Sequence, residues 1–178
     1  MTKTILIFLL LASSLSAQAA RDAAQVRQLT AEDSGDKVEA IRQLTQTADP
    51  DAVRVLQAMA DDSLYLAGDK AVIIEGDKAF DAASGAAIKV PADAESVTVN
   101  NRIRGELANA LAALKLFDAD AGVRLASAQK LQSSVSPEMA PLLAQALEKE
   151  SDARIKGMLA IAKAPAALAR TAALVRRG

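Results

Sequence analysis

The stretch DKVEAIRQLTQTADPDAVRVLQAMA, from Asp36 to Ala60, decides the fold expected for this chain. Apolar residues recur at helical spacing on both sides of a break at Asp49-Pro50-Asp51: Val38, Ile41 and Leu44 before it, and Val53, Leu56 and Met59 after it. The break has the chemistry of a helix start, because Asp49 can cap the second helix and Pro50 suits its first position. Asp36 and Glu39 form a candidate capping box for the first helix. The stretch therefore predicts two helices, each with one apolar stripe.

The same pattern returns downstream. Val123, Ala128 and Leu131 precede a second break at Ser136-Pro137-Glu138, and apolar residues resume from Met139 to Leu147. A third copy begins at Asp152, about 32 residues after Asp120, a period typical of helical-hairpin arrays. Each pair leaves an apolar face that the next pair can cover, and the many alanines let helices approach closely. The sequence predicts a mostly α fold, a HEAT-like helical-hairpin repeat solenoid.

The segment from about residue 64 to 99 has a different character. Valine and isoleucine cluster there, and Gly68-Asp69, Gly76-Asp77 and Ser84-Gly85 supply turns. It is interpreted as a small inserted β-hairpin or meander that packs on the solenoid, because a sheet of this size is not stable alone. The candidate strands are Ala71–Glu75, Ala79–Asp81, Ala87–Val90 and Val97–Val99. Helix then resumes near Asn101 and continues to Phe117.

The first nineteen residues have the three parts of a secretory signal peptide. Lys3 supplies the positive charge, Ile5–Leu11 the apolar core, and Ala17-Gln18-Ala19 the small residues of a cleavage site. The expected cut lies between Ala19 and Ala20, which leaves a helical-repeat domain at residues 20–178. An uncleaved anchor is the alternative, although the apolar core is shorter than the roughly 20 residues of a membrane-spanning helix. We therefore expect a periplasmic protein, exported by a signal peptide.

Composition narrows the function. The chain has neither cysteine nor histidine, which removes disulfides, thiol nucleophiles and the usual ligands of transition metals. The net charge is −1 and aromatic residues make up 2%, whereas a nucleic-acid-binding surface needs a basic stripe and stacking aromatics. We expect no DNA or RNA partner, no cofactor, no metal site and no catalytic residue, and hence a protein that is not an enzyme.

Three pairs of acids could be imagined as acid–base groups or a calcium site: Asp49 with Asp51, Asp61 with Asp62, and Asp118 with Asp120. All of them flank predicted helix ends, where a carboxylate caps backbone amides or is solvated in a loop. The structural interpretation is favoured for all three.

Candidate docking residues lie where the sheet gives way to the next helix. The run Asn100-Asn101-Arg102-Ile103-Arg104 is dense in hydrogen-bonding groups. Alternatively, Asn100 or Asn101 caps the following helix, while Arg102 and Arg104 are solvated or pair with Glu106. Tyr65, the only tyrosine, is a candidate interface anchor, although a lone tyrosine at a strand edge is more often ordinary packing.

Several of these motifs occur together in one known family. The chain resembles the N-terminal extracytoplasmic region of urea ABC transporter permease subunits, within the branched-chain amino acid permease-like family. The most specific element is the Val-Asn-Asn-Arg run at residues 99–102, and the others are the signal peptide, AIRQL at 40–44, ADPDA at 48–52, LQAMAD at 56–61, the hairpin at Leu64-Tyr65 and VRLA at 123–126.

The resemblance implies a non-enzymatic domain that assists urea uptake by docking on the transporter's membrane subunits and on the urea-binding protein. In that family the region precedes a bundle of membrane helices, which is not found here. The expectation is therefore a truncated or separated portion of a permease, attached to the inner membrane if it is part of a longer chain. The alternative is a generic periplasmic HEAT-like scaffold unrelated to transport. The resemblance implies no catalytic or urea-contacting residue, and the oligomeric state is left open.

Overall fold

The computed structural model describes residues 23–47, 49–132 and 136–162. The predicted signal peptide, residues 1–19, lies outside these ranges. Within them, every helix is too short or too polar to traverse a lipid bilayer.

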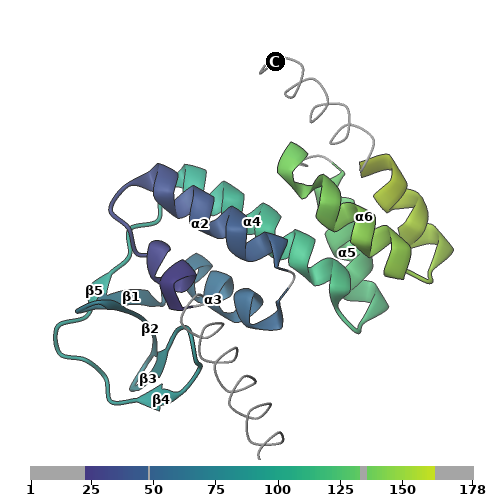
Figure 1. Cartoon of the computed structure of the whole chain (residues 1–178). Helices are drawn as coiled ribbons and strands as arrows, with labels where there is room; N and C mark the ends of the chain where they lie inside the picture. The colour runs from purple at the N-terminus through teal and green to yellow at the C-terminus, as the bar shows by residue number, and fades with distance from the viewer. Residues whose placement is uncertain (1–22, 48, 133–135, 163–178) are drawn as a thin grey trace, which may run out of the picture.

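The fold is mostly helical, with a small antiparallel sheet at one end (Figure 1). Short helical segments lie at residues 23–28 and 153–162, on either side of the main elements. The helices are α2 (Ser34–Gln46), α3 (Pro50–Ala60), α4 (Asn101–Leu114), η1 (Lys115–Phe117), α5 (Ala121–Leu131), η2 (Pro137–Met139) and α6 (Ala140–Lys149). The strands are β1 (Leu64–Ala67), β2 (Lys70–Glu75), β3 (Lys78–Asp81), β4 (Ala87–Ile88) and β5 (Glu95–Ser96).

Helix α2 begins earlier than the sequence suggested. Asp33 is its N-cap, and the Asp33 carboxylate accepts the backbone N–H groups of Gly35 and Asp36 at 2.6 and 3.2 Å. The predicted capping box is therefore wrong, because Asp36 already lies in the first turn and Glu39 instead accepts a hydrogen bond from the Gln43 side chain. The cap was missed because Ser34 and Gly35 carry no apolar periodicity.

An aspartate is also the N-cap residue of three further helical segments. Asp49 accepts the N–H of Asp51 at 2.9 Å with Pro50 in the first turn, which confirms the predicted start of α3. Asp120 caps α5 through two backbone N–H groups, at 2.6 and 3.2 Å. Asp152 caps residues 153–162 in the same way, at 2.8 and 3.2 Å. The sequence match between Asp120 and Asp152 thus corresponds to the same local structure.

The start of α6 differs from this pattern. A 3-10 turn, η2, precedes the helix, and the N-cap residue Met139 makes no side-chain capping hydrogen bond. The backbone carbonyl of Ser136 accepts the N–H of Met139 at 3.1 Å within this turn. The breaks at Pro50 and Pro137 therefore differ, because Asp49 caps α3 directly whereas a 3-10 turn precedes α6.

The five strands form one antiparallel sheet in the order β4-β3-β2-β1-β5. All of them lie within the segment where the sequence placed the inserted strands, but β1 was not among the candidates. The predicted strand Ala87–Val90 ends at Ile88, because Ile88 pairs with Ala79 and its partner strand β3 begins only one residue before that, at Lys78.

The predicted strand Val97–Val99 is wrong, since the pairing with β1 is made by Glu95 and Ser96. Val97 still donates its N–H to the Leu64 carbonyl at 3.2 Å, and Leu64 is where β1 begins, so nothing remains to pair with beyond it. The chain then turns inward, and Val97 is buried in the core. The Lys37 ammonium group of α2 holds this return segment by donating to the Thr98 carbonyl at 2.9 Å.

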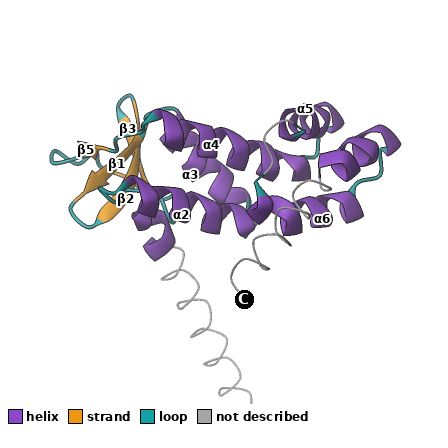
Figure 2. Cartoon of the chain, turned by 90° about the horizontal axis from the view of Figure 1, so that it is seen from above, coloured by secondary structure: helices purple, strands orange, loops and turns teal. Residues whose placement is uncertain are grey.

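Two apolar clusters make up the interior. The first lies between the sheet and helices α2, α3 and α4, and the second between the end of α4, α5, α6 and residues 153–162 (Figure 2). Helix α4 contributes to both, because Leu111 and Leu114 belong to the first cluster whereas Ala112 and Ala113 belong to the second. One continuous helix therefore joins the two halves of the molecule.

Ion pairs connect neighbouring elements within each half. Arg42 of α2 contacts Glu106 of α4, with the guanidinium and carboxylate 2.6 Å apart. In the other half, Arg124 of α5 makes a two-point contact with Glu150, which follows α6, at 2.8 and 3.2 Å. The Glu150 side chain is only 2% exposed, so this second pair lies largely out of solvent.

Gly105 offers a simple stabilising change. It lies on the exposed side of α4, and a Cβ added there would meet no atom within 4 Å. Because glycine in a helix interior costs about 1 kcal/mol relative to alanine, we expect Gly105→Ala to raise the free energy of unfolding by roughly 0.5–1 kcal/mol. Chemical denaturation followed by circular dichroism measures the difference.

Gly85 is the matched control for this prediction. Its φ of +72° belongs to the left-handed region, and an added Cβ would lie 3.3 Å from Nη2 of Arg54. Gly85→Ala should therefore lower the stability. A loss of stability for Gly105→Ala equal to that for Gly85→Ala would contradict the prediction.

Candidate functional site

The acidic pairs singled out in the sequence have structural partners. Asp49 and Asp120 cap helices, and Asp118 accepts the N–H of Asp120 at 2.8 Å. Asp61 accepts hydrogen bonds from the Gln57 amide, and Asp62 pairs with an arginine of α4. Among the residues that the structure describes, no group of three or more acids is placed to hold a metal ion.

The residues around Asn100 have distinct roles. The Asn100 side chain accepts the Ile103 N–H at 3.0 Å and so caps α4, while its amide nitrogen donates to the Ser34 hydroxyl. Asn101 and Arg102 are exposed in the first turn of α4. The capping alternative weighed in the sequence is therefore confirmed for Asn100, and docking at Asn101 and Arg102 stays a prediction.

Arg104 pairs across elements, not along its own helix. Its guanidinium lies 3.0 Å from the Asp62 carboxylate, in the turn after α3. The predicted alternative partner, Glu106, is engaged by Arg42 instead.

Tyr65 lies on β1, half-buried, opposite Val72 and Ser96. Strand β1 is flanked by β2 on one side and β5 on the other. Tyr65 therefore lies on an inner strand, whereas the sequence suggested a position at a strand edge.

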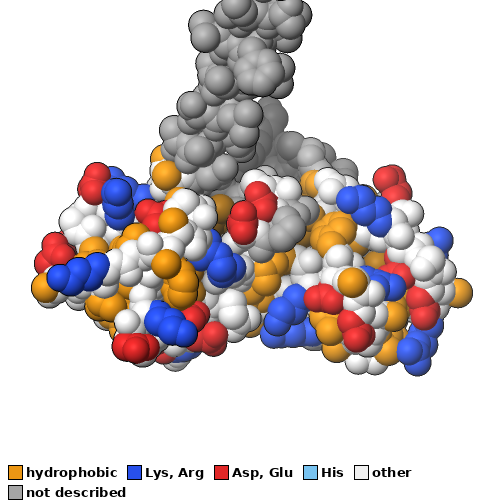
Figure 3. Space-filling model, turned by 90° about the horizontal axis from the view of Figure 1, so that it is seen from below, with side chains coloured by type: hydrophobic (Ala, Val, Ile, Leu, Met, Phe, Trp, Pro, Cys, Tyr) orange, Lys and Arg blue, Asp and Glu red, His pale blue; other side chains and the backbone are white. Residues whose placement is uncertain are grey.

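A groove of about 540 Å³ lies between α3, α4 and α5. Figure 3 shows the hollow between the two halves of the molecule, with hydrophobic side chains at its centre and Lys or Arg side chains beside them. Two other cavities, about 90 and 20 Å³, are far smaller. The groove is lined by Gln57, Ala60, Arg104, Ala108, Leu111, Ala112, Lys115, Val123, Ala126, Ser127 and Lys130.

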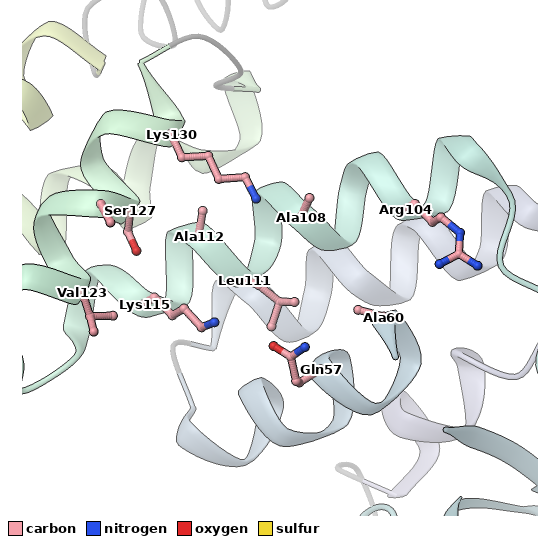
Figure 4. Close-up of a pocket in the computed structure, with 11 residues that line it drawn as sticks. Gln57, Ala60, Arg104, Ala108, Leu111, Ala112, Lys115, Val123, Ser127 and Lys130 are labelled. Atoms are coloured by element: carbon pink, nitrogen blue, oxygen red, sulfur yellow. The ribbon is translucent and has the colours of Figure 1, made fainter. Parts of the chain in front are cut away.

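Two helices present regular stripes to this groove (Figure 4). The stripe on α4 begins at Arg104 and ends at Lys115, the first residue of η1; we call it the α4 stripe. The α5 stripe runs from Val123 to Lys130, and both advance in steps of three or four residues with one adjacent pair. Such steps place residues on one face of a helix. The apolar lining residues form the floor of the groove, and four of these six are alanines, at positions 60, 108, 112 and 126. The hollow exists because these side chains are short.

The charged groups of the lining are all basic. Arg104 lies at one end of the α4 stripe and Lys115 at the other, and Lys130 reaches toward the groove from α5 (Figure 4). No Asp or Glu belongs to the lining, although Asp62 neutralises Arg104 from just outside it. The groove thus combines an apolar floor with positive ends, which suits the binding of an apolar surface that carries acids.

Of the five residues predicted to dock a partner, Arg104 alone lines the groove. Sequence reasoning missed Lys115, Lys130 and the alanine floor. The helical spacing of both stripes was visible in the sequence, but alanines at that spacing were attributed to helix–helix packing. No protein-family model, curated protein or solved structure matches the chain.

Proposed function

We propose that this protein is a non-enzymatic, extracytoplasmic docking domain of a urea ABC transporter permease, which assists urea uptake by binding other transporter components. The observation that carries the docking role is the groove between α3, α4 and α5, with its alanine floor and basic ends. Its lining contains no cysteine, histidine or carboxylate, the side chains most used for nucleophilic and acid–base catalysis.

The proposed architecture is a HEAT-like array of helix pairs. In support, Asp120 caps α5 and Asp152 caps residues 153–162, the next helical segment but one, through the same two backbone contacts at similar distances. The helix pairs α2–α3 and α5–α6 belong to two separate apolar clusters, and the continuous helix α4 packs into both. Arrays of this kind commonly bind proteins along a concave surface.

The transporter assignment is supported by the resemblance of residues 48–52, 56–61 and 99–102 to urea permease subunits. The proposed partners are the membrane subunits and the urea-binding protein. The proposed location is the periplasm, reached through the signal peptide, with attachment to the inner membrane if the domain belongs to a longer permease.

Co-purification tests this role. The full chain, tagged and expressed in bacteria grown on urea as nitrogen source, should recover urea transporter subunits from solubilised inner membranes. Ala126→Trp places a large side chain in the groove and should abolish the recovery, because Ala126 is exposed on the groove-facing stripe of α5. Gln129→Trp is the control, since Gln129 is exposed on the same helix outside the lining. Recovery that is equal for both variants would contradict docking in the groove.

A second candidate is a periplasmic scaffold unrelated to transport. The groove favours it as much as the first, because nothing in its lining is specific to a urea transporter. Groove-dependent recovery of other envelope proteins, without transporter subunits, would favour this second candidate.

A further inference from the structure

From the placement of charge along the groove, we infer that its partner is an amphipathic helix with two acidic side chains about three turns apart and apolar side chains between them. This inference rests on the docking role proposed above and adds the chemistry of the partner. It depends on three features: the length of the α4 stripe, the size of the floor residues and the position of the basic groups.

The length of the stripe favours a helix over a small molecule. Arg104 and Lys115 mark the ends of the α4 stripe, and they are eleven positions apart. At 1.5 Å per residue this corresponds to about 16 Å along the helix axis. A partner helix lying along α4 would span the same length in about three turns. Residues of α3 lie beside the middle of this path, and residues of α5 lie near its Lys115 end (Figure 4).

The floor requires large side chains from the partner. Ala60 and Ala108, which are half-buried, and Ala126, which is exposed, leave space where larger residues would fill the groove from within. A helix that lays leucine-like side chains into a groove of small residues buries apolar surface, which favours binding. This mode of binding uses residues at positions i, i+3, i+4 and i+7 of the partner.

The basic groups set the charge of the partner. Lys115 is half-buried. It takes part in none of the three ion pairs found among the described residues, which are Arg42–Glu106, Arg104–Asp62 and Arg124–Glu150. The Arg104 and Asp62 side chains are 49% and 53% exposed, and an ion pair so exposed contributes little energy. One carboxylate of the partner can therefore bind Arg104 beside Asp62 or in place of it, at one end of the groove. The second carboxylate can pair with Lys115 at the other end.

Synthetic peptides test the inference directly. The probe is a helical peptide with leucines on one face and two glutamates eleven residues apart; a second peptide has lysines in place of the glutamates, and a third has the glutamates seven apart. Binding to the full chain is measured by fluorescence anisotropy at low and physiological salt. We expect the first peptide to bind at least tenfold more tightly than the second and more tightly than the third, with a preference that weakens as salt rises.

Two protein variants locate the interaction. Lys115→Glu should weaken binding of the first peptide about tenfold, because it places like charges together at one end of the groove. Lys89→Glu makes the same change in charge at an exposed loop residue outside the groove, and should leave binding unchanged. Circular dichroism spectra confirm that both variants are folded.

The inference is overturned if the glutamate and lysine peptides bind equally, or if Lys115→Glu and Lys89→Glu behave alike. These outcomes are separate from the fate of the transporter role. Selective peptide binding without recovery of transporter subunits would leave the acidic helix as the partner and refute the urea transporter. Recovery of transporter subunits with no preference among the peptides would support the transporter role and refute the acidic helix as the partner.

Discussion

Leu143→Ala should lower the free energy of unfolding by about 3 kcal/mol, because it empties the centre of the second apolar cluster. Leu143, in α6, is completely buried and is enclosed by residues of α4, α5 and the segment 153–162. For a chain of this size, that loss corresponds to a drop in the melting temperature of roughly 6–12 °C. Thermal unfolding followed by circular dichroism measures it.

The control lies on the same helix. Leu147 is only partly buried at the edge of the same cluster, so Leu147→Ala should cost less than half as much. Equal losses for the two variants would show that Leu143 does not occupy the centre of the cluster.

The same variant tests whether the two halves unfold together. Tyr65 is the only tyrosine and the chain has no tryptophan, so intrinsic fluorescence reports on β1 in the first half. Since α4 packs into both clusters, Leu143→Ala should shift the fluorescence transition and the circular dichroism transition by the same amount. A fluorescence transition that keeps its wild-type midpoint would mean that the halves are independent.

Glu150→Gln is expected to have the second largest effect on stability. The Glu150 carboxylate accepts hydrogen bonds from Arg124 at two points and from the backbone N–H groups of Ser151 and Asp152, at 2.8 and 2.9 Å. Arg124 itself is anchored by the carbonyl groups of Asp118 and Ala119. Replacing a charged acceptor in such a network by a neutral amide should cost about 2 kcal/mol at pH 7, measured by chemical denaturation.

The pH dependence of this cost follows from the pKa of Glu150. Hydrogen bonding to Arg124 lowers the pKa from 4.5 to about 2, against the opposing effect of desolvation, with further help from the N–H groups of Asp152 and Ser151. A carboxyl group with a lowered pKa contributes stability above its unfolded value, and that contribution is lost as the pH falls toward the folded value. The difference between wild type and Glu150→Gln should therefore be full above about pH 5 and shrink between pH 4.5 and 2. A difference that stays constant over this window would show that the ionised carboxylate is not its source.

Local signals made part of this fold predictable. The break at Asp49-Pro50-Asp51 is a helix start in the structure, and Asn100 caps α4, because both depend on a side chain and on the backbone within three residues of it. The turns at Gly68 and Gly76 have positive φ, and they separate β1, β2 and β3. Such features depend on neighbouring residues alone, so they can be predicted without knowing which distant segments come into contact.

Contacts between distant segments could not be predicted in the same way. Arg42 and Glu106 lie on different helices, and Lys37 reaches a carbonyl group more than fifty residues away. The groove is of this kind, since its lining comes from three helices and its alanines have the same appearance in sequence as alanines that pack between helices. Only the relative placement of α3, α4 and α5 distinguishes an open alanine from a covered one.

The outer strands of the sheet also affect how copies of this protein meet. Both β4 and β5 are only two residues long, so a neighbouring molecule finds almost no free row of backbone donors and acceptors to extend. Glu95 adds a negative charge to one of these borders. Short outer strands of this kind disfavour intermolecular strand pairing, the first step toward fibrils.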